Sequence, residues 1–329
     1  MVYKVTTNEV IKDDNTTSFY NVVVGVLESA RPTPGGSTSG YTSGGQGFVP
    51  PYSNYSNVID KFSFSSDGNA TDVGDLSETR GFIAGNSSSE HGYTTGGDQP
   101  GYSNTIDKFP FAVDGNASDV GNLLSTLLYH SGQSSTESGY ASGGFTPPYT
   151  NVIQKFSFSS DGNSSDVGDL TRFHGYQAGT NSAENGYTAG GYGPPFSGAD
   201  YYNNIEKFPF ASDGNASDVG DLTQARYAPG GQSSTENGYA SGGSAWPPYT
   251  PYNTIDKFPF ATDANATDVG DLTQSRDYVA GQSSTVSGYS SGGGNATNII
   301  DKFPFSSDDN ASDVGDLSVA RSRTAGQQV

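Results

Sequence analysis

A run of oxygen-bearing side chains recurs six times along the chain and is the first candidate for chemistry. Residues 67–75 read Asp-Gly-Asn-Ala-Thr-Asp-Val-Gly-Asp. Carboxylate, amide and hydroxyl oxygens at such short spacing are ligands that Ca²⁺ accepts. The run lacks the distal glutamate and the glycine position of an EF-hand loop. A turn in which Asp and Asn bond their own backbone uses the same residue types. We therefore expect a turn, with no metal and no other cofactor.

The same run contains an Asn-x-Ser/Thr sequence in every copy, which is the acceptor pattern for N-linked glycans in a secretory pathway. Residues 1–5, Met-Val-Tyr-Lys-Val, contain no apolar signal-peptide core. Turn chemistry therefore explains these asparagines better than glycosylation does. They are Asn69, Asn116, Asn163, Asn215, Asn265 and Asn310.

The chain offers no recognisable catalytic arrangement. His91, His130 and His174 stand at different places in their repeats, without a Ser or Cys partner at a known motif, and the chain has no cysteine. An aspartate that recurs in every repeat is better explained by structure than by one catalytic pair. We predict that the protein is not an enzyme and has no catalytic residues.

The oxygen-rich run belongs to a longer repeat with constant internal spacing. In all six copies a leucine follows the repeat's lysine by 15 residues, as in Lys61 and Leu76. In the five copies that have a following Gly-Tyr pair, it comes 16 residues after that leucine, as at Gly92. Only the loop after the Gly-Gly pair varies, from 4 to 11 residues. In repeat proteins such variable loops gather on one face, which is often the binding face.

Each repeat predicts four short strands. Residues 255–260, Ile-Asp-Lys-Phe-Pro-Phe, alternate around two phenylalanines, as in a strand with one buried face. An Asp-Gly-Asn turn follows, and Asp-Val-Gly-Asp-Leu returns as the next strand. Gly-Tyr-x-x-Gly-Gly and Ala-Gly-Gln-Ser-Ser are the other two. No segment has a sustained helical period, so almost no helix is expected.

Four strands in about 47 residues, repeated six times, are typical of a β-propeller. We predict an all-β fold: a six-bladed propeller over residues 40–329, preceded by an N-terminal docking arm and linker at residues 1–39. The last residues, Ala-Gly-Gln-Gln-Val, match the start of one strand, and residues 37–41 supply its continuation. Both termini would then complete one blade and close the ring. The alternatives are an open stack of six units and, for the arm, an extra edge strand on one blade.

The order of features resembles a kelch-type blade. In that family a strand ending in Gly-Gly is followed by a variable loop, a strand, a hairpin, a strand and a return that contains arginine. The resemblance covers residues 40–329 and implies a kelch-like propeller, although this chain has a single Trp where the family repeats one. The arginine stands at Arg80, Arg226, Arg276 and Arg321, is displaced to Arg172 in the third copy, and is replaced by Leu127 in the second.

Aromatic residues gather in the variable loops. They predict a stacking surface for sugars or for a protein partner; the alternative is that they pack their own loops beside Pro-Pro pairs. Single exposed aromatics are ordinary, whereas six clusters on one face are not. The candidate binding residues are Tyr52, Tyr55, Tyr102, Tyr149, Phe196, Tyr201, Tyr202, Trp246, Tyr249 and Tyr252.

Composition disfavours two classes of partner. The formal net charge is −20, whereas binding to nucleic acid needs Lys and Arg at the phosphates. No apolar run reaches 18 residues, so no membrane-spanning helix and no membrane partner are expected. The aromatic share of 12% argues for a folded chain.

The repeat also resembles repeats in predicted structural proteins of aquatic bacteriophages. The similar stretch is residues 255–273, Ile-Asp-Lys-Phe-Pro-Phe-Ala-Thr-Asp-Ala-Asn-Ala-Thr-Asp-Val-Gly-Asp-Leu-Thr. The resemblance implies a virion protein of a tail fibre, a neck or a capsid decoration, found outside cells after host lysis. Its partners would be other virion proteins, through residues 1–39, and a host surface glycan or protein.

Two other function classes stay open. One is a cellular propeller that binds a protein or glycan through its loops. The other is an enzyme, such as a glycan lyase or hydrolase, with one polar blade beside the central channel. Only the second repeat differs strongly from the common repeat sequence, at residues 121–130, and the residues that differ there are mainly apolar. It therefore predicts contact with a neighbouring chain, a second copy included. The expected assembly residues are Val22, Val24, Leu124, Leu127 and Leu128.

Overall fold

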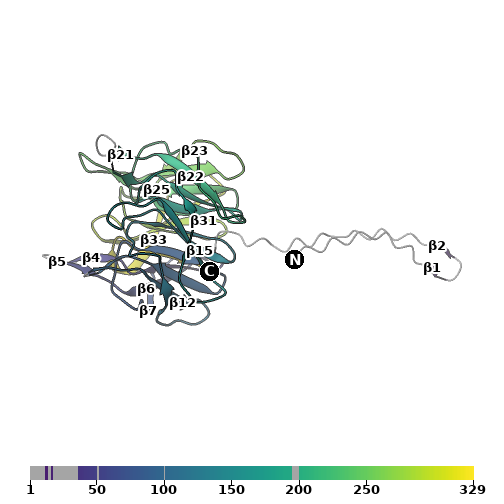
Figure 1. The fold of residues 1–329 in the computed structure, drawn as a ribbon, viewed down its shortest axis with the longest axis horizontal. Helices are drawn as coiled ribbons and strands as arrows, with labels where there is room; N and C mark the ends of the chain where they lie inside the picture. The colour runs from purple at the N-terminus through teal and green to yellow at the C-terminus, as the bar shows by residue number, and fades with distance from the viewer. Residues whose placement is uncertain (1–11, 14–15, 18–35, 50–51, 100, 195–199) are drawn as a thin grey trace.

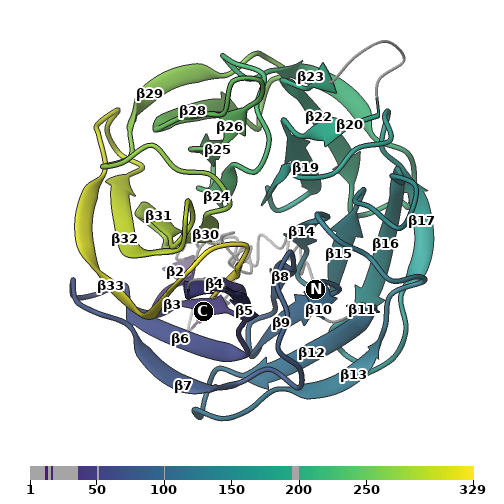
Figure 2. The ribbon, with the colours of Figure 1, turned by 90° about the vertical axis from the view of Figure 1, so that its left-hand side faces the viewer.

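Six four-stranded antiparallel sheets are arranged around a central axis (Figures 1 and 2). The computed structural model describes residues 12–13, 16–17, 36–49, 52–99, 101–194 and 200–329, and no helix occurs among them. The fold is therefore an all-β, six-bladed propeller, as the repeat predicted. Val22, Val24 and most of the predicted docking arm lie outside the described residues.

Within each blade the four strands follow one another from the axis to the outside, and they are named here in that order, innermost first. Blade 1 contains β34 (Ala325–Gln328), β3 (Ser39–Ser43), β6 (Val58–Ser63) and β7 (Thr71–Asp75). Blade 2 contains β8 (Ala84–Ser87), β9 (His91–Thr95), β12 (Thr105–Pro110) and β13 (Ser118–Asn122). Blade 3 contains β14 (Ser131–Ser134), β15 (Ser138–Ser142), β16 (Val152–Ser157) and β17 (Ser165–Asp169).

Blades 4 to 6 repeat this order. Blade 4 contains β18 (Ala178–Asn181), β19 (Asn185–Ala189), β22 (Asn204–Pro209) and β23 (Ser217–Asp221). Blade 5 contains β24 (Gly230–Ser233), β25 (Asn237–Ser241), β28 (Thr254–Pro259) and β29 (Thr267–Asp271). Blade 6 contains β30 (Ala280–Ser283), β31 (Ser287–Ser291), β32 (Thr297–Pro304) and β33 (Ser312–Arg321).

Within the described ranges, five short strand pairs lie outside the blades. Four are in variable loops: β4 (Gln46–Val49) with β5 (Tyr52–Tyr55), β10 (Asp98–Gln99) with β11 (Gly101–Tyr102), β20 (Tyr192–Gly193) with β21 (Asp200–Tyr201), and β26 (Ser244–Ala245) with β27 (Thr250–Pro251). The fifth joins β1 (Lys12–Asp13) to β2 (Thr16–Thr17).

The C-terminal strand completes the first blade. β34 pairs with β3, with Gly40 opposite Gln328 and Ser43 opposite Ala325. β34 also lies beside the innermost strands of blades 2 and 6, so the six innermost strands form a continuous ring. The alternative of an open stack is therefore excluded.

Small residues allow the innermost strands to meet. Each carries a glycine whose added Cβ would lie only 2.0–2.3 Å from the carbonyl oxygen of the corresponding glycine in the preceding blade, blade 6 preceding blade 1. No side chain fits in that space, so the glycines set how closely the blades approach the axis. They are Gly85, Gly132, Gly179, Gly231, Gly281 and Gly326.

The paired phenylalanines form the contact between blades. Tyr41 of blade 1 lies against Phe109 and Phe111 of blade 2, with ring centroids 5.5 and 4.9 Å apart. The same triad recurs at every junction, ending with Tyr289 of blade 6 on Phe62 and Phe64 of blade 1. Such aromatic pairs stabilise by about 0.5–1.5 kcal/mol beyond area burial. A blade therefore completes its core only with its neighbour.

A buried ion pair crosses four of the six junctions. The arginine at the end of one blade pairs with the aspartate that follows isoleucine in the next, at 2.8–3.1 Å, with both side chains at most 1% exposed. The pairs are Arg80–Asp107, Arg226–Asp256, Arg276–Asp301 and Arg321–Asp60.

The other two junctions change both partners together. At the junction of blades 2 and 3, Leu127 takes the place of the arginine and Gln154 that of the aspartate. At the next junction the residues are His174 and Glu206, 3.6 Å apart and fully buried. Burial lowers the pKa of His174 to about 3 and raises that of Glu206. The third copy's equivalent of the arginine is therefore His174, and the assignment to Arg172 was wrong: Arg172 instead lies over the ring of Tyr202.

The oxygen-rich turns link neighbouring blades at the rim. Each asparagine of the Asn-x-Ser/Thr sequences accepts a hydrogen bond, of 2.9–3.1 Å, from a backbone N–H of the preceding blade, as Asn116 does from Asp75. The aspartate two residues earlier pairs with a lysine of that blade, as Asp114 does with Lys61 at 2.9 Å. The expected turns are thus contacts between blades, and among the described residues no group of three metal-ligating side chains occurs.

The natural Leu127–Gln154 junction suggests a test of the buried ion pairs. Arg226→Leu leaves Asp256 buried without its partner and should lower the free energy of unfolding by about 3–5 kcal/mol. The double variant Arg226→Leu/Asp256→Gln copies the uncharged junction and should recover most of that loss. Urea unfolding of both variants measures the difference, and a double variant no more stable than the single one contradicts the prediction.

The glycine ring gives a second prediction. Gly281→Ala would place a Cβ 2.0 Å from the Gly231 carbonyl oxygen and should cost about 1–3 kcal/mol through overpacking. Gly214→Ala is the matched control, because nothing lies within 4 Å of its added Cβ, and it should change stability by less than about 1 kcal/mol. Equal melting temperatures for the two variants would argue against a close-packed axis.

Candidate binding face and axial channel

The variable loops emerge on one face of the propeller, which we call the loop face and which is turned to the viewer in Figure 2. The Gly-Gly pairs turn the chain there: Gly44 and Gly45 have φ of +57° and +105°, a combination open to glycine and costly for other residues. The opposite face, which we call the turn face, carries the Asp-Gly-Asn turns and the turns that follow the innermost strands. The loop face therefore holds the chain's variable sequence.

The predicted binding aromatics differ in exposure. Tyr102, Trp246 and Tyr249 are exposed, at 47%, 56% and 41% of their surface. Half-buried members are Tyr55, Tyr149, Tyr201, Tyr202 and Tyr252. The side chains of Tyr52 and Phe196 lie outside the described residues. Of the members that the structure describes, three large rings are thus open to solvent.

The half-buried members make defined contacts within their own loops or with neighbouring loops. The Tyr55 hydroxyl donates to Asp98, Tyr201 stacks on Tyr227 at 5.5 Å, and Tyr149 meets Phe145 at 5.0 Å. Even the exposed Tyr249 donates its hydroxyl to Asp277 at 3.1 Å. Several loop aromatics therefore hold their own loops in place, as the alternative interpretation proposed.

A closed ring of backbone hydrogen bonds surrounds the axis beneath the loops. One residue of each blade donates its N–H to the carbonyl of the preceding member, at 2.6–3.3 Å. All six have φ between +53° and +63°, in the left-handed region. The members of this axial ring are Phe82, Tyr129, Tyr176, Ala228, Tyr278 and Arg323. The sequence signal for them is position, because each follows the arginine site of its repeat by two residues.

Side chains of the axial ring form an aromatic cluster at the centre of the loop face. Tyr129 stacks on Tyr176 at 3.9 Å, and Tyr227, next to Ala228, meets Tyr176 and Tyr278 at 5.8 and 6.0 Å. The guanidinium of Arg323 lies 4.8 Å from the ring centres of both Phe82 and Tyr278. We call Phe82, Tyr129, Tyr176, Tyr227, Tyr278 and Arg323 the axial cap; all six are half-buried.

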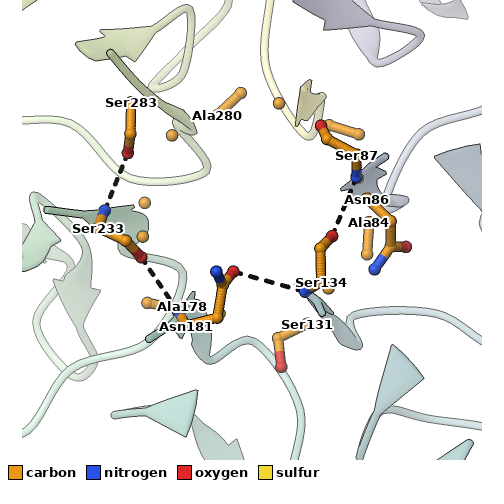
Figure 3. A pocket seen from close by; sticks show the side chains of 18 of the residues that line it. Ala84, Asn86, Ser87, Ser131, Ser134, Ala178, Asn181, Ser233, Ala280 and Ser283 are labelled. Carbon is orange, nitrogen blue, oxygen red and sulfur yellow. Dashed lines mark hydrogen bonds between the residues drawn. The ribbon is translucent and has the colours of Figure 1, made fainter. Parts of the chain in front are cut away.

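The channel below the axial ring is narrow and lined mainly by small uncharged residues. Its volume is about 130 Å³, and Ala84, Gly85, Ser131 and Ala178 are among the residues that line it. Its rim is a chain of inter-blade hydrogen bonds, shown in Figure 3: the Ser87 N–H donates to Ser134 Oγ and the Ser134 N–H to Asn181 Oδ1. A volume of this size holds several water molecules.

A wider cavity of about 370 Å³ adjoins this channel on the turn face. Serine-rich turns line it together with Gly36 and Val329. The Gly36 N–H donates to the Ser283 carbonyl at 2.7 Å, and the Thr285 N–H donates to the Gly36 carbonyl at 3.1 Å. The segment that leads into blade 1 therefore starts beside the axis on the turn face.

The three leucines expected at an assembly contact do not share one exposed patch. Leu124 is 54% exposed, whereas Leu127 and Leu128 are 0% and 1% exposed inside the blade. Leu127 fills the site of the buried arginine, which explains its apolar character without a partner. Polar substitutions at Leu127 and Leu128 would therefore test folding, and of the three leucines Leu124 alone is available for contact with another chain.

Among the described residues, no helix long and apolar enough to cross a membrane occurs.

The buried histidine beside the channel predicts acid sensitivity. His130 accepts or donates one hydrogen bond with Thr95, at 2.9 Å, and burial lowers its pKa from 6.5 to about 3. Below pH 6.5 the unfolded chain therefore takes up a proton that the folded protein does not, so stability falls as the pH drops from 6.5 toward 3. Above pH 6.5 this contribution is constant.

Urea unfolding at several pH values tests this. His130→Gln should reduce the slope of stability against pH below 6.5 by about 1.4 kcal/mol per pH unit. His174, whose pKa is lowered in the same direction, keeps its own contribution in the variant. An unchanged slope would show that His130 is protonated in the folded protein.

No protein-family model matches the chain, and no curated protein matches its sequence. What the protein does is therefore inferred from the loop face, the axial cap and the way the chain enters the propeller.

Proposed function

We propose that this protein is a non-enzymatic structural component of a bacteriophage particle, a kelch-like propeller that is held by its turn face and presents its loop face for attachment. The observation that carries the proposal is the separation of two surfaces. Gly36, where the described chain joins the propeller, lies beside the axis on the turn face, whereas the variable loops and their exposed rings lie on the opposite face. An attachment protein needs one end to anchor and another to bind.

Three further features support this role. The repeat resembles those of phage structural proteins, which implies that residues 1–39 dock to other virion proteins. The blades are joined by bonds at every layer from the axis to the rim, which suits a rigid display platform that works outside the cell. The channel is lined mainly by glycine, alanine, serine and amide side chains, and its one lining histidine, His130, is buried and bonded to Thr95; such a set favours packing over proton transfer or nucleophilic attack.

The second candidate is a cellular propeller that binds a protein or glycan through the same loops. The exposed Trp246 and Tyr102 favour it equally, because ring stacking serves either role. What separates the candidates is where the protein is found. Antibodies against the propeller, applied to purified particles in electron microscopy, should label the particle surface. Label confined to cell lysate would overturn the virion role and favour the cellular one.

Substitutions on the loop face test the attachment role. Trp246→Ala and Tyr102→Ala should each weaken binding of the purified full-length chain to host cells at least about tenfold, as loss of a central aromatic contact does. Val113→Ala is the matched control, because Val113 is 65% exposed in a hairpin turn on the turn face. Flow cytometry with labelled protein measures binding. Equal losses for all three variants, or for none, would contradict a role for the loop face.

A further inference from the structure

We propose that the axial cap is the centre of the ligand site and that its ligand is an acidic saccharide, one that carries carboxylate or phosphate groups. This inference rests on the proposed attachment function and names its ligand class. Neither the cap nor Arg323 belongs to the loop aromatics that the sequence predicted. Three observations point to the cap.

The first observation is backbone strain at aromatic residues. Phe82, Tyr129, Tyr176 and Tyr278 have φ of +53° to +63°, a region that costs a residue with a large side chain free energy that glycine would not lose. The backbone ring does not require these side chains, because Ala228 occupies the same position and makes the same two hydrogen bonds. The chain therefore retains strained aromatic residues where a small residue closes the ring equally well. Strain of this kind is concentrated at ligand sites.

The second observation is a cation without a carboxylate partner. The four buried arginines and the six rim lysines all form ion pairs. Arg323 forms none with the described residues: its Nη1 donates to Gln46 Oε1 at 2.5 Å and weakly to Ser322 Oγ. Its Nε is buried without a hydrogen-bond partner among them. A chain with a net charge of −20 thus places, at the centre of its loop face, a guanidinium that forms no ion pair with a described carboxylate.

The third observation is the chemistry around that cation. Asp98 and Asp277, two carboxylates beside the cap, already accept hydrogen bonds from Tyr55 and from Tyr249 and Ser244. The cap itself offers aromatic rings, tyrosine hydroxyls and a guanidinium. Aromatic rings pack against the C–H faces of sugar rings, hydroxyls exchange hydrogen bonds with sugar hydroxyls, and a guanidinium binds a carboxylate or phosphate. An acidic sugar matches all three groups, whereas a neutral one leaves the charge unused.

Binding to an array of purified bacterial surface polysaccharides, both acidic and neutral, tests the inference with the full-length chain. The wild-type protein should prefer acidic polysaccharides, and its affinity should fall with added salt. Arg323→Gln should weaken binding to the best acidic polysaccharide about tenfold or more. Arg172→Gln is the matched control, an exposed arginine that lies 5.1 Å from the Tyr202 ring away from the axis, and its affinity should stay within about twofold of wild type.

A second variant guards against a folding defect in the first. Tyr227→Leu removes a ring from the cap but lies outside the backbone ring, and it should weaken binding to the same polysaccharide while the melting temperature stays close to that of wild type. Failure to bind any acidic polysaccharide, or equal affinity of Arg323→Gln, Tyr227→Leu and wild type, overturns the inference. If Trp246→Ala loses host-cell binding and Arg323→Gln keeps it, the attachment function stands and only the axial site fails.

Discussion

The structure depends on the close approach of six innermost strands around one axis. A Cβ added to any glycine of this ring would lie 2.0–2.3 Å from the carbonyl oxygen of the corresponding glycine in the preceding blade, a distance that no side chain allows. Because the ring is closed, every blade has a neighbour on both sides and none has an exposed core. If one blade became wider at the axis, the other five would have to shift to keep the ring closed. This explains why the spacing between residues within the blades is constant, whereas the length of the loops varies.

From this constraint follows a series of concentric contacts between blades. Outside the glycines, an amide side chain such as Gln282 donates to the carbonyl of Tyr41 in the next blade at 3.0 Å. The aromatic triads and the buried ion pairs both involve the second and third strands of the blades, and lysine–aspartate pairs link neighbouring blades at the rim. The exposed rim pairs contribute about 0–1 kcal/mol each, whereas each aromatic pair adds about 0.5–1.5 kcal/mol beyond its area burial. The rim pairs and the buried pairs specify how neighbouring blades are aligned, because each joins a particular residue of one blade to a particular residue of the following blade.

The excess negative charge lies mainly on the outer wall. The outermost strands leave one sheet edge unpaired in each blade, and their sequence, Thr/Ser-Asp-Val-Gly-Asp/Asn, places aspartates such as Asp72 and Asp268 there, both exposed. Charged residues on an edge strand oppose pairing with a strand of another molecule. The negatively charged outer walls of two molecules therefore repel each other. The loop face, in contrast, has aromatic rings around Arg323.

The sequence by itself determined the architecture. Constant spacing between Lys61 and Leu76 and its equivalents, paired phenylalanines, Gly-Gly turns and matching terminal fragments were enough to predict six four-stranded blades, because each reports local strand geometry or a repeated contact. It also placed the variable loops together, since all length changes occur at one point of the repeat.

Tertiary structure alone decided which residues meet across blades, because those partners lie in different repeats and the repeat pattern does not pair them. It showed that His174 replaces the arginine and faces Glu206, that Leu127 is buried beside Gln154, and that the turn asparagines bind the neighbouring blade. It also brought Phe82 and Arg323, at opposite ends of the propeller sequence, into contact at the axis. A repeat pattern reports what each blade contains, whereas a site on the axis combines one residue from every blade, and only closing the ring assembles it.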